Sequence, residues 1–324
     1  MSSPWIWTCR PGFEADLAAE LGRRGLREVR TVGPSLVGSR GRPPAFPVFA
    51  RTGFPLVWEG PAEPDAVARG IAGLLAAAGR SRPWILLPWV PDSDADNPHG
   101  AEVERLAVAV DAPGRVKEAD AVRYGGLAVQ LCLAGGVARA GALDAGDLPT
   151  LSPGGRVRAP MPKDAPSRAG RKLEEAFAWV GRGPEAGDLC VDLGAAPGGW
   201  TAVLLGRRAR VIAVDPAQLA PAFRGRRGLV HVKASAFDFV PDEPVDWLLC
   251  DMAWRPLEVA QLLAKWGKKK WAHALVANVK LPMKQRIEHV DKVVAAVTGG
   301  GWSDVRARQL YHDREEVTLS AWRV

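Results

Sequence analysis

The sequence has 324 residues, of which 47% are hydrophobic and 24% charged, as in a folded globular protein with room for two domains. It contains no apolar run of about eighteen residues and begins without the regions of a signal peptide, so we expect a cytoplasmic protein with no membrane span. The formal net charge of +7 lies in the second half, where residues 151–324 carry 27 Lys and Arg against 19 Asp and Glu. This excess favours a polyanionic partner, although a solvated basic surface gives the same pattern.

The cysteines and histidines predict neither disulfides nor a metal site. Cys9, Cys132, Cys190 and Cys250 lie far apart and form no C-x-x-C pair, and the five histidines have no metal-ligand spacing. Such cysteine usage suits a reducing compartment. We therefore expect a protein without a metal, and we favour a monomer.

The first half of the chain shows irregular periodicity. We predict strands at 6–9 and 84–90 and helices at 13–21, 67–78 and 101–110. A Pro- and Gly-rich stretch at 38–47 is predicted to separate two α/β units. Pro and Gly recur at 149–166, so we expect an N-terminal region at 1–150, a linker at 151–166 and a second domain at 167–324.

Strands and helices alternate in the second half. The predicted strands are 189–193, 210–214, 229–232, 245–250 and 274–279, the helices 172–180, 200–205, 257–266 and 286–297, and the closing hairpin 305–310 with 316–322. This order predicts a Rossmann-like α/β fold, with a mostly parallel sheet and an antiparallel edge hairpin. Ligands bind such sheets at the carboxyl ends of the strands, where Asp215, Asp251 and Lys280 are expected.

The stretch CVDLGAAPGGWT, residues 190–201, forms a glycine-rich turn after a strand. The dinucleotide fingerprint G-x-G-x-x-G fails because Ala196 replaces its middle glycine, and no G-K-[ST] follows for a Walker loop. A D-x-G-x-x-x-G pattern with Asp192 is typical of S-adenosylmethionine sites, where glycines let the cofactor approach the backbone. Asp215 is placed to accept from ribose hydroxyls, as an acid also does in nicotinamide enzymes. A tight turn without a ligand is the alternative.

Six segments resemble a known family: CRPGFEADLAAELG (9–22), DAPSRAGRKLEEAF (164–177), DLGAAPGGWT (192–201), LLCDM (248–252), VKLPMK (279–284) and ARQLYHDREEVT (307–318). With them the chain resembles the FtsJ-like class of RNA 2′-O-ribose methyltransferases, and within it the bacterial enzymes that modify a cytidine of 23S ribosomal RNA. The resemblance implies S-adenosylmethionine as the cofactor. It also implies a ferredoxin-like piece and a THUMP-type RNA-binding region before residue 150, which is matched mainly at its start.

The resemblance also implies a catalytic tetrad, namely Lys172, Asp251, Lys280 and Glu316. Lys280 would act as the general base or orient the ribose hydroxyl, Asp251 would tune Lys280, and the other two would hold the nucleotide. Glu315 is a competing candidate, but strand alternation sends neighbouring side chains to opposite faces, and the family motif favours Glu316.

The predicted cofactor set is Asp192, Gly194, Ala195, Ala196, Pro197, Gly198, Gly199, Trp200, Asp215, Ser235, Asp238 and Asp251. Where the family has an acid for the adenine amino group, this chain has Ser235, with Asp238 three residues away, so the adenine contact stays open between them. For Trp200, packing of the helix on the sheet is favoured over lining the pocket, and for Trp254 and Trp271 core packing is favoured over stacking on bases.

The implied partner is large-subunit ribosomal RNA or an early precursor. Predicted phosphate contacts are Arg168, Arg224, Arg226, Arg227 and Lys284. Three other hypotheses compete with this one: another RNA substrate such as transfer RNA, an inactive RNA-binding assembly factor, and a nicotinamide oxidoreductase. An intact tetrad argues against the second, and the third lacks both the middle glycine and a catalytic Tyr or His constellation.

Overall fold

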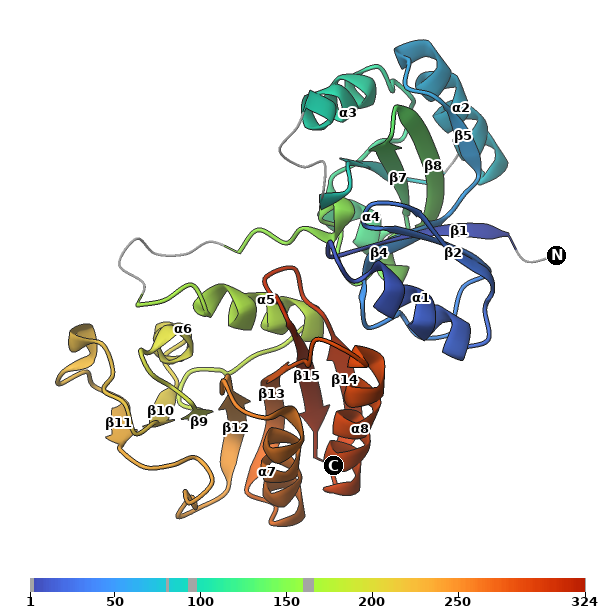
Figure 1. Ribbon diagram of the computed structural model, residues 1–324. Coiled ribbons are helices and arrows are strands. Elements are labelled where there is room, and N and C mark those ends of the chain that lie inside the picture. Colours follow the sequence, from blue (N-terminus) through green and yellow to red (C-terminus); the bar gives the residue numbers. More distant parts are fainter. Residues whose placement is uncertain (1–2, 80–81, 93–97, 160–165, 324) are drawn as a thin grey trace. The chain divides into compact units, whose positions relative to one another are not determined.

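The computed structural model describes residues 3–79, 82–92, 98–159 and 166–323, and the chain divides into two compact units (Figure 1). These units are Met1–Arg158 and Ala159–Val324. The division falls inside the stretch predicted as a linker, but Pro153–Gly155 of that stretch form a turn of the N-terminal unit, in which Gly154 and Gly155 are buried. Residues 160–165 of the predicted linker lie outside the described residues.

The N-terminal unit begins with an antiparallel sheet in the order β2-β3-β1-β4. Its elements are β1 (Pro4–Cys9), α1 (Glu14–Arg23), β2 (Arg27–Gly33), β3 (Leu36–Arg40) and β4 (Ala50–Pro55). The predicted strand and helix at its start are confirmed. The prediction that 38–47 separates two units is wrong, because this stretch contains the end of β3 and leads into β4 of the same sheet.

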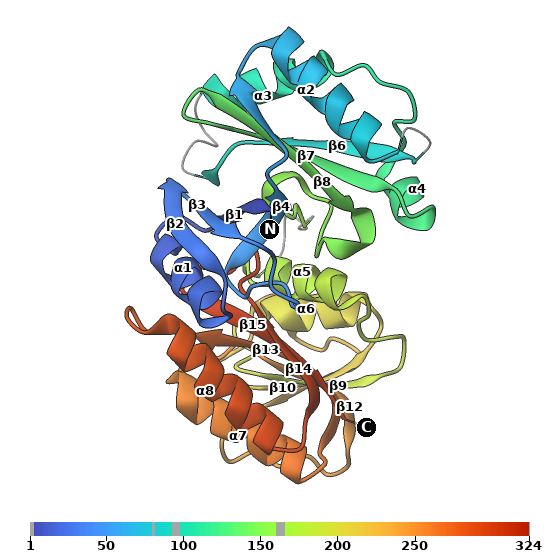
Figure 2. The same cartoon turned by 90° about the vertical axis from the view of Figure 1, so that its right-hand side faces the viewer.

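A second sheet, in the order β5-β8-β7-β6, completes this unit (Figure 2). Its elements are β5 (Trp58–Pro61), α2 (Pro64–Ala77), β6 (Trp84–Trp89), α3 (Pro98–Val108), α4 (Glu118–Arg123), β7 (Leu127–Ala134) and β8 (Val137–Asp144). The predicted helices α2 and α3 and strand β6 are confirmed. The hairpin β7–β8 was not predicted, since its continuous small and apolar residues hide the alternation of a strand.

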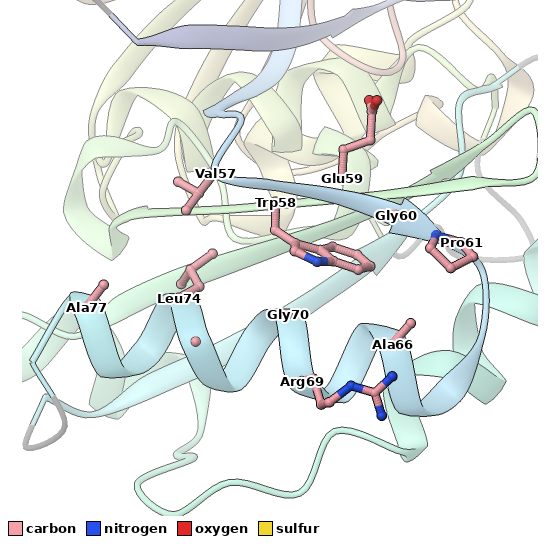
Figure 3. A pocket seen from close by; sticks show the side chains of 11 residues that line it. Val57, Trp58, Glu59, Gly60, Pro61, Ala66, Arg69, Gly70, Leu74 and Ala77 are labelled. Atoms are coloured by element: carbon pink, nitrogen blue, oxygen red, sulfur yellow. The ribbon is translucent and has the colours of Figure 1, made fainter.

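A cavity of about 600 Å³ lies between β5 and α2 (Figure 3). The Trp58 ring lies across it, and it fits because Gly60 and Gly70 face it: a Cβ on either would come within 2.6 or 2.5 Å of the ring. Glu59, one of its two charged lining residues, is paired with Arg139 at 2.7 Å. The cavity thus reflects the packing of α2 on an edge strand.

The C-terminal unit is one seven-stranded sheet in the order β11-β10-β9-β12-β13-β15-β14. The strands are β9 (Leu189–Leu193), β10 (Arg210–Val214), β11 (Leu229–Val232), β12 (Val245–Cys250), β13 (Ala272–Lys280), β14 (Ser303–Arg308) and β15 (Glu316–Trp322). The first five are parallel, and β15 and β14 are antiparallel, so the predicted sheet and edge hairpin are confirmed.

Helices cover both faces of this sheet (Figure 1). They are α5 (Gly170–Val180), α6 (Gly199–Gly206), α7 (Pro256–Lys268) and α8 (Arg286–Gly299). Helices α5 and α6 pack on one face around Phe177 and Leu204, while α7 and α8 pack on the other around Trp266. The left-handed Gly181 ends α5, and Pro256 starts α7, as expected for these residues. No helix in the described part of the chain is long and apolar enough to cross a membrane.

Candidate active site

The glycine turn lies at the carboxyl end of β9, the central strand of the parallel part of the sheet. Asp192 on β9 is fully buried, and its Oδ2 accepts a hydrogen bond from Thr201 Oγ1 at 2.7 Å. Its Oδ1 is buried and has no hydrogen-bond partner among the described residues. Burial, with a smaller contribution from the nearby Asp251, outweighs the Thr201 hydrogen bond and raises the pKa of this carboxyl to about 7. An unused buried acceptor beside a glycine turn is a ready contact for a cationic or donor group.

Asp215 follows β10 and organises the turn. Its Oδ2 accepts from the Ala196 amide at 3.0 Å, and its Oδ1 accepts from the Ala217 amide at 2.8 Å. The Ala196–Pro197 peptide bond is cis. Each carboxylate oxygen has a further lone pair, so Asp215 can still accept from a ligand hydroxyl.

The two glycines of the turn are required by geometry. Gly194 and Gly198 have φ values of +76° and +114°, where L side chains are strained. A Cβ on Gly194 would lie 2.7 Å from Met252 Cγ, and one on Gly198 would collide with the Phe223 ring. The turn is therefore fixed closely against the segments after β12 and β10.

The four residues of the predicted tetrad meet at this edge of the sheet. Glu316, at the start of β15, is 2% exposed, and its two carboxylate oxygens contact the ammonium groups of Lys172 and Lys280. Lys172 Nζ also lies 3.9 Å from Asp251 Oδ1. Glu316 is paired directly with Lys280 in the β15–β13 register. Two ammonium groups thus face two carboxylates in one cluster.

Burial and charge oppose each other in this cluster. Burial alone would lower the pKa of Lys172, but the carboxylates of Asp251 and Glu316 outweigh it and raise that pKa. Burial likewise would raise the pKa of Glu316, yet the two lysines lower it. For Asp251 burial is the larger effect, and its pKa is raised in spite of Lys172. In the cluster the charges of the buried Glu316, the partly buried Lys172 and Asp251 and the more exposed Lys280 compensate one another.

The ambiguity between the two neighbouring glutamates is resolved geometrically. Glu315 is exposed and pairs with Arg286 at 2.8 Å, away from the lysines. Strand alternation at the start of β15 thus turns Glu316 to the cluster, as the sequence predicted.

A buried polar layer that the sequence analysis missed supports the cluster. Asn278, two residues before Lys280 on β13, accepts from Thr318 Oγ1 at 2.7 Å and lies 3.5 Å from Asp313 Oδ1. Asn278 also hydrogen-bonds Asp251. Burial raises the pKa of Asp313 well above its usual range, and the Glu316 charge adds to this. The two-residue spacing from Lys280 was the available signal, because it puts Asn278 on the same face of the strand.

Glu175 fastens the helix that carries Lys172 to the loop before β15. It is buried, and it accepts from the amides of Tyr311 and His312 at 2.7 and 3.0 Å and lies 2.7 Å from His312 Nδ1. This contact sets the position of α5 against β15, and therefore of Lys172 against Glu316. Its spacing of three from Lys172 was the only signal in the sequence.

Three other residues of the predicted cofactor set differ in burial and in their hydrogen bonds, namely Trp200, Ser235 and Asp238. Trp200 is buried between α5, α6 and the sheet, and its Nε1 donates to Ala169 O at 3.0 Å, so it packs the helix as favoured. Ser235 Oγ accepts from the Phe237 amide at 3.2 Å, and Asp238 is exposed with its amide bonded to Ser235 O. Neither residue is brought to the tetrad.

The predicted phosphate contacts are all exposed: Arg168, Arg224, Arg226, Arg227 and Lys284. Trp254, for which core packing was favoured, is 51% exposed instead. Its ring lies 5.8 Å from that of Phe237, and its Nε1 donates to Glu258 at 2.6 Å. Trp254 lies in the short loop between β12 and α7. Because α7 begins at Pro256, two residues after Trp254, this loop stays outside the core.

The strand order, the glycine turn after β9 and the charged cluster at the carboxyl ends define a Rossmann-like α/β fold. Residues 165–260 match the family model described as FtsJ-like methyltransferase.

Curated relatives extend this likeness to nearly the whole chain. Ribosomal RNA large subunit methyltransferase M of Halorhodospira halophila is 37% identical over 99% of this chain and 97% of its own. The proteins of the same name from Alkalilimnicola ehrlichii and Thauera aminoaromatica are 35% and 34% identical over 98% and 96% of this chain, and 94% and 93% of their own. The chain belongs to the ribosomal RNA large subunit methyltransferase M family.

Proposed function

We propose that the protein transfers the methyl group of S-adenosylmethionine to the 2′-hydroxyl of a cytidine in large-subunit ribosomal RNA. The observation that carries this proposal is the contact of two lysines with one buried glutamate, Glu316, at the carboxyl edge of the sheet. The names of the curated relatives support ribosomal RNA as the substrate class.

The residues around the glycine turn fit S-adenosylmethionine. Asp192 offers an unpartnered buried oxygen, which suits the ammonium group of the methionine part. Asp215 retains lone pairs for the ribose hydroxyls, while its present bonds hold the turn at Ala196. When bound, the cofactor supplies an electrophilic methyl group on a positively charged sulfur. Ser235 and Asp238 remain the two candidates for the adenine contact.

The tetrad would then prepare the ribose oxygen. Lys280 receives the hydroxyl proton, or orients the hydroxyl as the proton leaves, while O2′ would form its bond to the methyl carbon as the carbon–sulfur bond breaks and S-adenosylhomocysteine leaves. When both lysines are charged, the formal charges of the four side chains sum to zero. Neutral Lys280 would therefore leave the cluster with a net negative charge, which favours a positively charged methyl donor nearby. Lys172 holds Glu316 in place and also lies beside Asp251. General-base assistance of this kind contributes about 10²–10⁴ in rate.

The remaining parts of the proposal concern RNA binding. Residues 1–150 would form a ferredoxin-like and THUMP-type RNA-binding region, joined by a linker at 151–166 to a methyltransferase domain at 167–324. The exposed cations Arg168, Arg224, Arg226, Arg227 and Lys284 would contact phosphates. The protein would act as a cytoplasmic monomer without a metal.

The test is methyl transfer from labelled S-adenosylmethionine to unmodified 23S ribosomal RNA, followed by mapping of the modified nucleotide. The wild type should give 2′-O-methylcytidine at one site, and Lys280→Ala should lose about 10²–10⁴ in rate while still binding RNA. Lys292→Ala, on the exposed face of α8, is the matched control. If the protein methylates transfer RNA instead, the proposed substrate is wrong. If it binds RNA but transfers no methyl group, an inactive assembly factor is favoured.

A further inference from the structure

A hollow of about 430 Å³ lies at the opposite end of β13 from the tetrad. Three segments end around it: α7 with Lys268, α8 with Gly299, and β15, which is followed by Arg323. Lys270 enters from the turn that leads into β13. We call this the amino-end hollow; its charged lining residues are Lys268, Lys270 and Arg323, and its other lining residues are glycines.

The glycines let the ends of α7 and α8 close together (Figure 2 shows the two helices side by side). A Cβ on Gly300 would lie 2.5 Å from Ala264 Cα, and one on Gly267 would lie 2.6 Å from Trp302 Nε1. Backbone therefore forms the wall of the hollow. Among the described residues its lining includes no apolar side chain and no carboxylate, so the chemistry of this part of the hollow is that of its cations.

These cations have no anionic partner within the described part of the chain. Neither Lys268, Lys270 nor Arg323 forms an ion pair there. The Nη1 of Arg323 is buried and has no hydrogen-bond acceptor among the residues that the structure describes. Its Nη2 lies 3.1 Å from His273 Nδ1. Buried donors normally have an acceptor, so the guanidinium has capacity for a ligand.

Helix capping explains only part of this arrangement. Lysines in the last turn of α7 interact favourably with its terminal carbonyls, which accounts for Lys268. Lys270 lies beyond the helix with a φ of +57°, a left-handed conformation that glycine or asparagine adopts more readily. Arg323 comes from a different element. Capping alone does not place these two cations at the same hollow.

We propose that the amino-end hollow binds the phosphodiester backbone of the RNA substrate. This proposal rests on the proposed function only because it takes RNA as the substrate. Three converging cations without an aromatic or amide group favour phosphate over base recognition. The hollow is separated from Lys280 by the nine residues of β13, or about 25 Å, so one nucleotide cannot reach both. The contact would require a folded RNA or a longer strand.

The experiment measures the affinity for unmodified 23S ribosomal RNA as a function of salt, and the KM for RNA in methyl transfer. The double variant Lys268→Gln/Lys270→Gln removes two charges. Lys292→Glu changes the net charge by the same amount on the exposed face of α8 and serves as the control. Melting temperatures of all three proteins establish that they are folded.

We expect the double variant to lose on the order of tenfold in RNA affinity at low salt and to reduce the salt slope by about 1.4–1.8, while the control behaves as the wild type. A double variant with the affinity and slope of the control would overturn the proposal. A second measurement is the melting temperature of each protein with added pyrophosphate. If pyrophosphate raises the melting temperature of the wild type alone while RNA affinity is equal in all three proteins, the proposal is also overturned, because the hollow would then bind a small phosphorylated ligand. If the wild type transfers no methyl group yet the double variant still loses RNA affinity, the proposed function fails and the RNA contact stands.

Discussion

The two ends of β13 hold cationic side chains in opposite ways. At the carboxyl end, Lys172 and Lys280 contact the carboxylate of the buried Glu316. At the amino end, the cations of the amino-end hollow have no carboxylate within the described residues. The difference follows from burial: a buried carboxylate without a partner is costly, whereas the ammonium groups of Lys268 and Lys270 are exposed and keep their water until a ligand replaces it. The compensated cluster is the basis of the proposed chemistry, and the uncompensated cations are the basis of the proposed contact with a polyanion.

The largest expected effect is on stability at the carboxyl end. Glu316→Ala would leave two lysines facing a cavity and should cost about 3–5 kcal/mol of unfolding free energy, since one partner of a buried ion network is removed. Glu315→Ala, which removes an exposed carboxylate, should cost less than about 1 kcal/mol. Urea unfolding of both variants measures this. Equal losses would contradict the role of Glu316 as the buried partner of the two lysines, which is the carboxyl-end half of the comparison.

A smaller effect concerns pH and the buried Asp192. Its pKa is raised to about 7 in the folded state, so the folded protein holds its proton more tightly than the unfolded chain. The stabilisation is present below about pH 4 and is lost as the pH rises to about 7, by up to about 4 kcal/mol. Asp192→Asn should lack this loss. Thermal melts of both proteins between pH 4 and 8 measure it, and parallel profiles would rule the effect out.

The glycine turn offers a third test of the carboxyl end. Gly198→Ala should cost about 2–4 kcal/mol, because the residue is left-handed and a Cβ there meets the Phe223 ring. Gly206→Ala, at the end of α6 with open space around its Cβ position, should be neutral or stabilising by up to about 1 kcal/mol. Melting temperatures of the two variants test the contrast. A tolerated Gly198→Ala would mean that the turn can move.

The smallest effect is expected at the amino end. Lys268→Gln should change stability by only about 0.3–1 kcal/mol, which is the contribution of one cation to the end of a helix. Denaturation at low and high salt measures it, and the change should shrink as salt is added. A loss of several kcal/mol would show that the hollow is structural and would remove the distinction between the two ends.

The C-terminal unit was largely predictable because its signals are local. Strands β9, β12 and β13 are largely apolar and buried, and each is followed by a helix in the chain. The N-terminal unit was predicted only in part. Strand β2, for example, is mostly exposed and has three charged residues among its seven, and it becomes a strand only through pairing with β3.

The sequence by itself determined the order of elements in the second unit, the glycine turn and the residues that end its strands, since periodicity and turn chemistry act between near neighbours. Only the tertiary structure decided which charges meet. Lys280 reaches Glu316 across 36 positions, and Glu175 reaches the loop before β15 across 136. The exposure of Trp254 and the convergence of cations at the amino-end hollow were decided in the same way. Such contacts depend on how helices and strands pack, and packing is set by the summed burial of many distant side chains.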